Sequence, residues 1–159
     1  MSIQVGERIP NITLAVMRPD GPAELSADEI FGGKKVVLFA LPGAYTPTCS
    51  QAHLPGYVVH RDAIVAKGVD TIACLSVNDA FVMGAWGEAS NAGDILMLAD
   101  GSGAFTEAVG LTLDLTDRHM GVRSQRYAMV VDDGVVTHLN VEDGGGFKVS
   151  DAETVLGLL

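Results

Sequence analysis

Hydrophobic residues gather into short blocks along the chain, and these blocks predict strands and helices in alternation. The apolar runs at 35–41 and 71–77 lack a polar face, which is typical of strands covered on both sides of a sheet. Between 49 and 67 apolar residues recur at helical spacing, and Pro55 is expected to kink this helix near its first turns. Further strands are predicted at 11–17, 95–99, 127–131 and 135–141. Helices are predicted at 79–86, with Asn78 as the cap, at 100–109, and in a last segment that ends at 158. The segment 17–25 is predicted to be a turn-rich connection.

The order of these elements predicts the fold class. A β-α-β-α-β series leads into an antiparallel hairpin that turns at 132–134, and a last helix follows, capped by Ser150 or Asp151. This succession predicts an α/β protein with a thioredoxin-like fold, in which helices flank a central mixed β-sheet. No repeat or linker interrupts the chain, so we expect a single domain over 1–159. The glycine-rich stretch before the last helix is expected to be an exposed, mobile loop.

Composition and charge narrow the function classes. With 159 residues, 48% of them hydrophobic, the chain can bury a core without disulfides. The net charge is −10 and the ten Lys and Arg residues are dispersed, which argues against nucleic acid or an anionic membrane as partner. No apolar run is long enough to span a membrane and the N-terminus lacks a targeting pattern, so we expect a reducing, cytoplasmic location. The two cysteines and four histidines share no metal-ligand spacing, and neither a metal nor a cofactor is expected.

One of the two cysteines stands in a frame that raises the question of reactivity. Cys49 lies between a predicted buried strand and a predicted helix, in the sequence PGAYTPTCSQAHLPGY at 42–57. A thiol in the first turn of a helix faces free backbone N–H groups and the positive end of the helix dipole, which favour the thiolate. A free cysteine is as often a small buried hydrophobe, and spacing alone does not choose between these interpretations. For Cys74, in the middle of an apolar strand, the core interpretation is favoured.

The residues around Cys49 carry a family resemblance. Pro42, Thr46 and Cys49 match the P-x-x-x-T-x-x-C signature of peroxiredoxins. The string PGAYTPTCS followed by HLPGY resembles the atypical type II, or peroxiredoxin-5, branch, as do the blocks at 72–87, 95–105 and 123–136. The resemblance therefore covers nearly the whole chain. It implies a thiol peroxidase that reduces hydrogen peroxide and alkyl hydroperoxides through a sulfenic acid, without a prosthetic group or metal.

The resemblance gives roles to four residues that match the family's motifs. Cys49 corresponds to the peroxidatic cysteine and Thr46 to the hydroxyl that contacts the peroxide. Pro42 corresponds to the residue that shields the thiolate, and Arg126 to the arginine paired with it. A guanidinium fork can hold a sulfur and a peroxide oxygen together, which is a physical reason for the role of Arg126. The predicted catalytic set is therefore Cys49, Thr46, Arg126 and Pro42.

Arg123 and His53 compete for places near that set. Arg123 is close to Arg126 in the sequence, and Arg126 is preferred because it immediately precedes the aromatic residue of RYAMVV. His53 comes one helical turn after Cys49 and is a candidate for supporting the site from behind. A histidine in such a position more often packs or faces solvent, so we do not count His53 as catalytic.

The same resemblance bears on how Cys49 is regenerated. Many members of the branch carry a resolving cysteine in the loop before the last helix, where this chain has Val149. Cys74 lies in the middle of a predicted apolar strand. A disulfide to it is expected to require local unfolding, because the two Cα atoms must lie within about 7 Å and the attacking sulfur must have access. We therefore predict a 1-Cys mechanism with an external thiol as reductant, glutathione with glutaredoxin or a thioredoxin. The resemblance also implies a homodimer built near the active-site loops.

Two other kinds of function stay open at this point. A redox-sensing or chaperone module, or an inert structural domain, is compatible with the same fold. Peroxide consumption that depends on Cys49 and Arg126 would separate the enzyme from both. Tyr45 and Trp86 are expected to be exposed, either as packing groups or as contact anchors. The segment 119–124 is expected to set the width of the substrate pocket.

Overall fold

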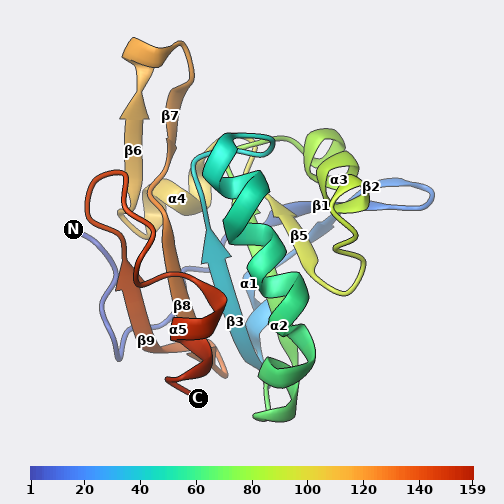
Figure 1. Ribbon diagram of the computed structural model, residues 1–159, viewed down its shortest axis with the longest axis vertical. Helices are drawn as coiled ribbons and strands as arrows, with labels where there is room; N and C mark the ends of the chain where they lie inside the picture. Colours follow the sequence, from blue (N-terminus) through green and yellow to red (C-terminus); the bar gives the residue numbers. More distant parts are fainter.

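A seven-stranded mixed sheet forms the centre of the computed structural model, which describes residues 1–159 (Figure 1). Its strands are β1 (Leu14–Arg18), β2 (Gly21–Leu25), β3 (Lys35–Ala40), β4 (Thr71–Ser76), β5 (Leu96–Ala99), β8 (Tyr127–Asp132) and β9 (Val135–Val141). They lie in the order β2-β1-β5-β4-β3-β8-β9. β3, β4 and β5 run parallel to one another, and the other pairs are antiparallel. The predicted α/β fold with a central mixed sheet is confirmed.

Helices cover both faces of this sheet. They are α1 (Ala27–Phe31), α2 (Leu54–Ala66), α3 (Ala80–Ala89), α4 (Ala104–Ala108) and α5 (Ala152–Leu156), and a π-helical turn, η1 (Cys49–His53), leads into α2. Val36 and Leu38 of β3 belong to the apolar cluster under α1 and α4, whereas Phe39 belongs to the cluster under α2, α3 and α5. Successive side chains of β3 are therefore buried on opposite faces, as the unbroken apolar run predicts. None of the helices has the length and apolar character that a membrane span requires.

The edge strand β2 corrects the expectation of a turn-rich connection at 17–25. This strand pairs antiparallel with β1, and the tight turn between them places Gly21 at a φ of 126°, a conformation that favours glycine. Pro22 argues against a strand in the sequence, but an edge strand tolerates proline because one of its sides makes no ladder hydrogen bonds. The strand before it begins at Leu14 rather than at residue 11.

Helix caps differ from the prediction at α3. The side chain of Asp79, not Asn78, caps α3 by accepting a hydrogen bond from the Val82 N–H at 2.9 Å. Asn78 instead accepts from the Ala44 N–H at 3.0 Å and from the Ser76 hydroxyl at 2.6 Å. Its side chain therefore ties the end of β4 to the loop that follows β3. A short polar residue before a helix fits either use, which is why the local pattern alone does not separate them.

The last helix and the loop before it are close to the prediction. Asp151 caps α5, and the helix ends at Leu156 rather than at 158. Ser150, the other candidate cap, is buried and donates its hydroxyl to the carboxylate of Glu142 at 2.7 Å. Residues 143–145 are exposed as expected, but Glu142 anchors the far end of the loop.

A two-stranded arm that the sequence pattern does not predict stands beyond the end of the main sheet. It consists of β6 (Thr112–Leu115) and β7 (Gly121–Ser124), joined through the 3₁₀ turn η2 (Thr116–Arg118). Each strand has only four residues and no run of apolar side chains, so neither stands out in the hydrophobic pattern. In Figure 1 the arm extends past the end of the main sheet.

Candidate active site

Cys49 lies in the segment that follows β3, at the carboxyl ends of the parallel strands. The helical segment begins at residue 47, so the thiol is in its first turn, as predicted. This turn is π-helical, because the Leu54 N–H donates to the carbonyl of Cys49, five residues back. This wider turn ends just before Pro55, which takes a place in the first turn of α2, where its missing N–H has the least consequence. Single π-turns inside helices are frequent at functional sites.

Arg126 is the side chain that reaches the sulfur. Its Nη2 donates to Cys49 Sγ at 3.1 Å, and the thiol itself is fully buried. The two residues are 77 positions apart, but β8 pairs with β3 in a register that sets Tyr127 opposite Ala40. Arg126, one residue before β8, is thereby placed at the edge from which the Cys49 turn starts. A buried sulfur thus has a permanently charged donor against it.

Arg123, the rival arginine, has a different set of partners. Its Nε donates to the Met120 carbonyl at 2.9 Å and its Nη1 to the Pro42 carbonyl at 3.2 Å. A Cβ on Gly43 would lie 2.7 Å from that Nη1, so glycine lets the guanidinium pass close to the backbone. Arg123 therefore links the arm to the loop before Cys49 and makes no contact with the sulfur.

Thr46 and Pro42 lie in the loop that leads to Cys49, and both line a hollow of about 470 Å³. The Thr46 hydroxyl donates its one hydrogen to the Gly43 carbonyl at 2.7 Å, which leaves its lone pairs free to accept. Apolar side chains of the arm form the opposite wall, and the two charged residues of the lining are both arginines. The lining includes Leu113, Leu115, Arg118, Met120 and Arg126. Met120 comes from the segment 119–124 that was expected to set the pocket width.

His53 lies beneath the arginine and is fully buried. Arg126 Nη1 is 2.9 Å from its Nδ1, and its Nε2 is 3.1 Å from the carbonyl oxygen of Ser150. Burial, and then the neighbouring Arg126 charge, lower the pKa of His53 from 6.5 to about 3, so the ring is neutral. Because arginine only donates, Nδ1 must accept and Nε2 must carry the hydrogen. The sequence offers one signal for this contact, the four-residue spacing from Cys49.

Cys74 is fully buried in the central strand β4, as predicted, opposite Phe39 of β3. Burial, and then the charge of Cys49, raise the pKa of its thiol well above the ordinary value. Both cysteines are free thiols. Cys74 therefore lacks the charged donor and the helical first turn that Cys49 has.

The two aromatic residues expected at the surface differ from one another. Tyr45 is 56% exposed, but Trp86 is 1% exposed, which corrects the expectation for it. Trp86 lies on the inner side of α3, and its Nε1 donates to the hydroxyl of Ser50 at 3.0 Å. The buried indole N–H thus finds its acceptor in the residue next to Cys49.

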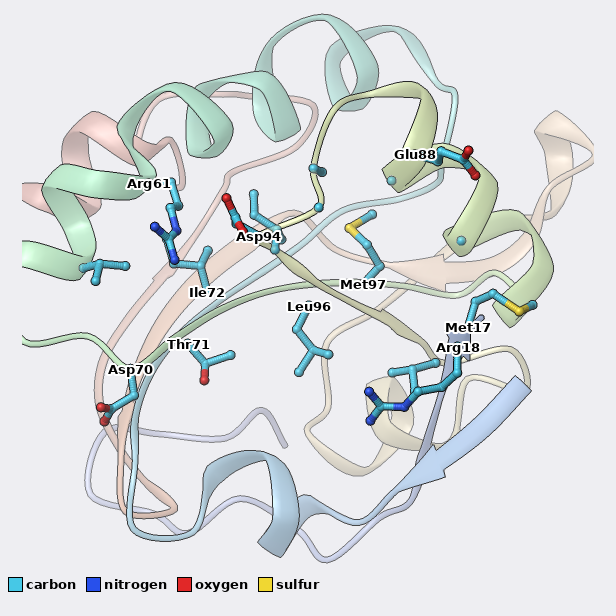
Figure 2. Close-up of a pocket in the computed structure, with 17 residues that line it drawn as sticks. Met17, Arg18, Arg61, Asp70, Thr71, Ile72, Glu88, Asp94, Leu96 and Met97 are labelled. Atoms are coloured by element: carbon cyan, nitrogen blue, oxygen red, sulfur yellow. The ribbon is translucent and has the colours of Figure 1, made fainter. Parts of the chain in front are cut away.

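A second hollow, of about 570 Å³, lies at the amino-terminal ends of the parallel strands, away from Cys49, and contains no thiol. Thr71 and Leu96, the first residues of β4 and β5, line it, whereas Cys49 follows the last residues of β3. Figure 2 shows Arg61 and Asp94 at one end of this hollow and Arg18 at the other. Its charges are mixed and its walls hold no reactive group. No three His, Cys, Asp or Glu side chains of the chain are grouped to hold a metal ion.

A helical first-turn thiol held against an arginine, on a sheet of this order, defines a thiol-based oxidoreductase. Residues 4–156 match the Redoxin family model. Peroxiredoxin-2E-2, chloroplastic, of Oryza sativa subsp. japonica is 51% identical over 164 residues, which cover 99% of this chain and 73% of that protein. The hybrid peroxiredoxin hyPrx5 of Haemophilus influenzae is 42% identical over 162 residues, covering 100% of this chain and 67% of that protein.

Among solved structures, reduced Prx3 of Vibrio vulnificus in complex with H₂O₂ superposes with a TM-score of 0.96, at 58% identity and 98% coverage of both chains. The chain therefore belongs to the peroxiredoxin family, with relatives of the type II and peroxiredoxin-5 kind, and its fold is thioredoxin-like. It is an enzyme, a thiol peroxidase.

Proposed function

We propose that Cys49 is the peroxidatic residue and that it reduces hydrogen peroxide and alkyl hydroperoxides by a 1-Cys mechanism. The observation that carries this proposal is the 3.1 Å contact between Arg126 Nη2 and Cys49 Sγ. Thiolate is the nucleophilic form of cysteine, and a fixed positive donor at the sulfur favours it. The Vibrio vulnificus relative, whose structure contains H₂O₂, supports hydrogen peroxide as one substrate.

In the first step the Cys49 thiolate attacks the distal oxygen of the hydroperoxide. An S–O bond forms while the O–O bond breaks, the sulfur is oxidised to sulfenic acid, and the departing alkoxide or hydroxide takes a proton to leave as an alcohol or water. Negative charge develops on both oxygens as their bond breaks. In this proposal Arg126 donates to them, and one donor of this kind typically contributes about 10²- to 10³-fold to the rate.

Pro42 and Thr46 have supporting roles in this step. Thr46 Oγ1 accepts the peroxide's hydrogen, because its own hydrogen is committed to the Gly43 carbonyl. Pro42 covers the approach to the sulfur with a ring that has no N–H and so offers no competing donor. The hollow that both residues line is also lined by Arg126, whose Nη2 contacts the sulfur, and it is the proposed route for a peroxide and later for a thiol.

Regeneration then requires thiols from outside the chain. A first thiol attacks the sulfenic acid sulfur and releases water, leaving a mixed disulfide, and a second thiol reduces that disulfide and restores Cys49. Cys74 is a poor resolving group, because it is fully buried and burial raises the pKa of its thiol. Val149 takes the place of a resolving cysteine in the loop before α5. Glutathione with glutaredoxin, or a thioredoxin, is the proposed reductant.

The mechanism is tested by the mass of the protein after one equivalent of hydrogen peroxide without added thiol. A 1-Cys protein gains one oxygen atom at Cys49, whereas a Cys49–Cys74 disulfide loses two hydrogens and would exclude the 1-Cys route. Steady-state turnover with glutathione and glutaredoxin, compared with thioredoxin, then identifies the reductant. Absence of turnover with either system would contradict the proposed reductant while leaving the oxidation result intact.

We also propose a homodimer that forms at the end of the molecule near Cys49. Tyr45 and Phe81 are 56% and 67% exposed, although both are large and apolar. Asn78 bonds the residue before Tyr45 and stands three positions before Phe81, so both aromatics lie at this end. Charged substitution, Phe81→Glu, is expected to yield monomers in sedimentation experiments, with Phe81→Leu as the matched control. A wild-type protein that sediments as a monomer would contradict the dimer.

A further inference from the structure

The guanidinium of Arg126 is oriented by two contacts that point in different directions. Nη2 donates to Cys49 Sγ at 3.1 Å and Nη1 is 2.9 Å from His53 Nδ1. A single contact would leave the planar fork free to rotate on its long side chain, whereas two contacts fix its plane. His53 is thus the group that decides how the arginine meets the sulfur.

The chemistry of this acceptor is unusual for an arginine. The one ion pair in the chain joins Arg61 to Asp62, so no carboxylate lies within ion-pair distance of Arg126. A carboxylate in the place of His53 would orient the guanidinium equally well but would neutralise the charge that the sulfur and the peroxide need. A neutral imidazole accepts the hydrogen bond and leaves the full positive charge available.

His53 is itself held in one orientation and one tautomer. Its Nε2–H donates to the Ser150 carbonyl at 3.1 Å, which leaves Nδ1 as the acceptor for Arg126. The rings of Phe39 and Phe147 pack on it, with centroids 5.0 and 5.1 Å away. Phe147 also lies 5.8 Å from the guanidinium carbon of Arg126, so its ring covers both partners.

The Ser150 carbonyl is positioned by the segment 142–150, which we call the strap. The Glu142 carboxylate accepts from the backbone N–H groups of Lys148, Val149 and Ser150 at 2.8–2.9 Å and from the Ser150 hydroxyl at 2.7 Å. At its start the strap is tied to the arginine, because the Glu142 N–H donates to the Arg126 carbonyl at 2.9 Å. One buried carboxylate thereby fixes the backbone that holds the imidazole.

We propose that His53 is a positioning residue, which as the neutral Nε2–H tautomer sets the Arg126 fork on the Cys49 sulfur, and that Glu142 holds it there through the strap. The inference rests on the proposed role of Cys49. It places the effect in the peroxide step, because reduction of the sulfenic acid by an outside thiol does not use the thiolate–guanidinium contact.

The test is the second-order rate constant of the reduced enzyme with hydrogen peroxide, followed through the fluorescence of Trp86, the single tryptophan, which bonds the residue beside Cys49. His53→Leu, which keeps volume but has no acceptor, is expected to lower this constant about 10- to 100-fold. His53→Asn, whose side-chain oxygen can stand near the Nδ1 position, is expected to recover most of the loss. The rate of the later thiol step is expected to be unchanged in both variants.

A double-mutant cycle separates positioning from a general structural effect. In an Arg126→Ala background, His53→Leu is expected to cause no further loss, because the group it positions is gone. Equal losses in both backgrounds, or a peroxide rate in His53→Leu equal to that of the wild type, would overturn the inference. Failure of the wild type itself to react would instead contradict the proposed role of Cys49.

Glu142→Gln gives a second test at a distance from the sulfur, and it applies even where His53→Leu does not fold. The amide oxygen still accepts hydrogen bonds, but the negative charge that strengthens the bonds from the N–H groups of the strap is lost. The Ser150 carbonyl is then held less firmly, and the peroxide rate is expected to fall several-fold. Glu153→Gln, an exposed glutamate on α5, is the matched control and is expected to leave the rate unchanged. An unchanged rate in Glu142→Gln would contradict the part of the inference that concerns the strap.

Discussion

Cys49 and Cys74 are both fully buried and belong to one apolar cluster, yet their local structure and their polar contacts differ. Cys49 is in a helical first turn with a guanidinium at 3.1 Å, while Cys74 is in the middle of a strand with apolar neighbours. Burial, and then the charge of Cys49, raise the pKa of the Cys74 thiol, which disfavours the reactive thiolate. The comparison teaches that the charged donor, rather than access to solvent, distinguishes a reactive thiol from a core thiol in this fold.

The largest expected effect comes from exchanging each thiol for a hydroxyl. Cys49→Ser is expected to reduce peroxide turnover to background, because no nucleophile remains. Cys74→Ser is expected to retain turnover within about threefold, at a stability cost of about 1–3 kcal/mol for a hydroxyl buried among apolar groups. Coupled peroxide assays and urea unfolding measure the two quantities. Loss of turnover in Cys74→Ser at full folding would mean that the second thiol takes part in the reaction.

Removal of the cation is expected to have the next largest effect. Arg126→Ala is expected to lower the peroxide rate constant about 10²- to 10³-fold, because the reacting sulfur and oxygens lose their charged donor. Arg123→Ala is the matched control, since it removes an arginine that bonds only the Pro42 and Met120 carbonyls. A larger loss in Arg123→Ala than in Arg126→Ala would reverse the assignment of the two arginines.

Two threonines close to Cys49 in the sequence, Thr46 in the loop and Thr48 in the helical turn, allow a finer comparison. Thr46→Val is expected to lower the peroxide rate about 10-fold or more, because it removes the acceptor for the peroxide's hydrogen and the bond to Gly43. Thr48→Val alters a residue that lines the same hollow and is expected to change the rate less than threefold. Stopped-flow oxidation of the reduced protein measures both. Equal losses in the two variants would remove the special role of Thr46.

The smallest effect expected is on stability in weak acid. Because the pKa of His53 is lowered to about 3, the folded ring stays neutral while the unfolded ring gains a proton below its ordinary value of 6.5. The unfolded state therefore binds more protons, and stability falls as the pH decreases from 6.5 towards 3, by about 2 kcal/mol at pH 5 for this group. His53→Asn is expected to show a shallower decrease in urea unfolding between pH 7.5 and 5. Parallel decreases in the two proteins would contradict a buried neutral His53.

The parts of the fold that local patterns predict well are those built from continuous apolar runs. β3, β4 and the hairpin of β8 and β9 follow the hydrophobic blocks, and the motif around Cys49 identifies the loop of the site. The hydrophobic pattern does not predict the arm of β6 and β7, because its strands are short and their function depends on a tertiary contact, the hollow that they line with the Cys49 loop. The bonding partners of Asn78 are not predictable from the sequence either, because a short polar residue can cap a helix or bridge two loops. The tertiary fold determines which of these it does.

The residues that hold Arg126 in position are also not predictable from the sequence pattern. His53, Ser150 and Glu142 meet through contacts up to 97 residues apart, and each side chain alone has an ordinary local explanation. What the sequence carries is the spacing of the reacting residues, whereas the register of β8 on β3 and the closure of the strap bring their supports together. The expected reducing compartment, like the dimer, stays a prediction.

Labelling of the two cysteines within one sample tests the difference between them most directly. Reduced protein is treated with excess hydrogen peroxide in the presence of a sulfenic-acid trap, and peptide masses report Cys49 and Cys74 separately. The trap is expected on Cys49 alone, with Cys74 recovered as a free thiol, and Arg126→Ala is expected to slow the labelling of Cys49. Labelling of both cysteines at similar rates, or of Cys49 at the same rate with and without Arg126, would contradict the claim that the guanidinium makes this buried sulfur reactive.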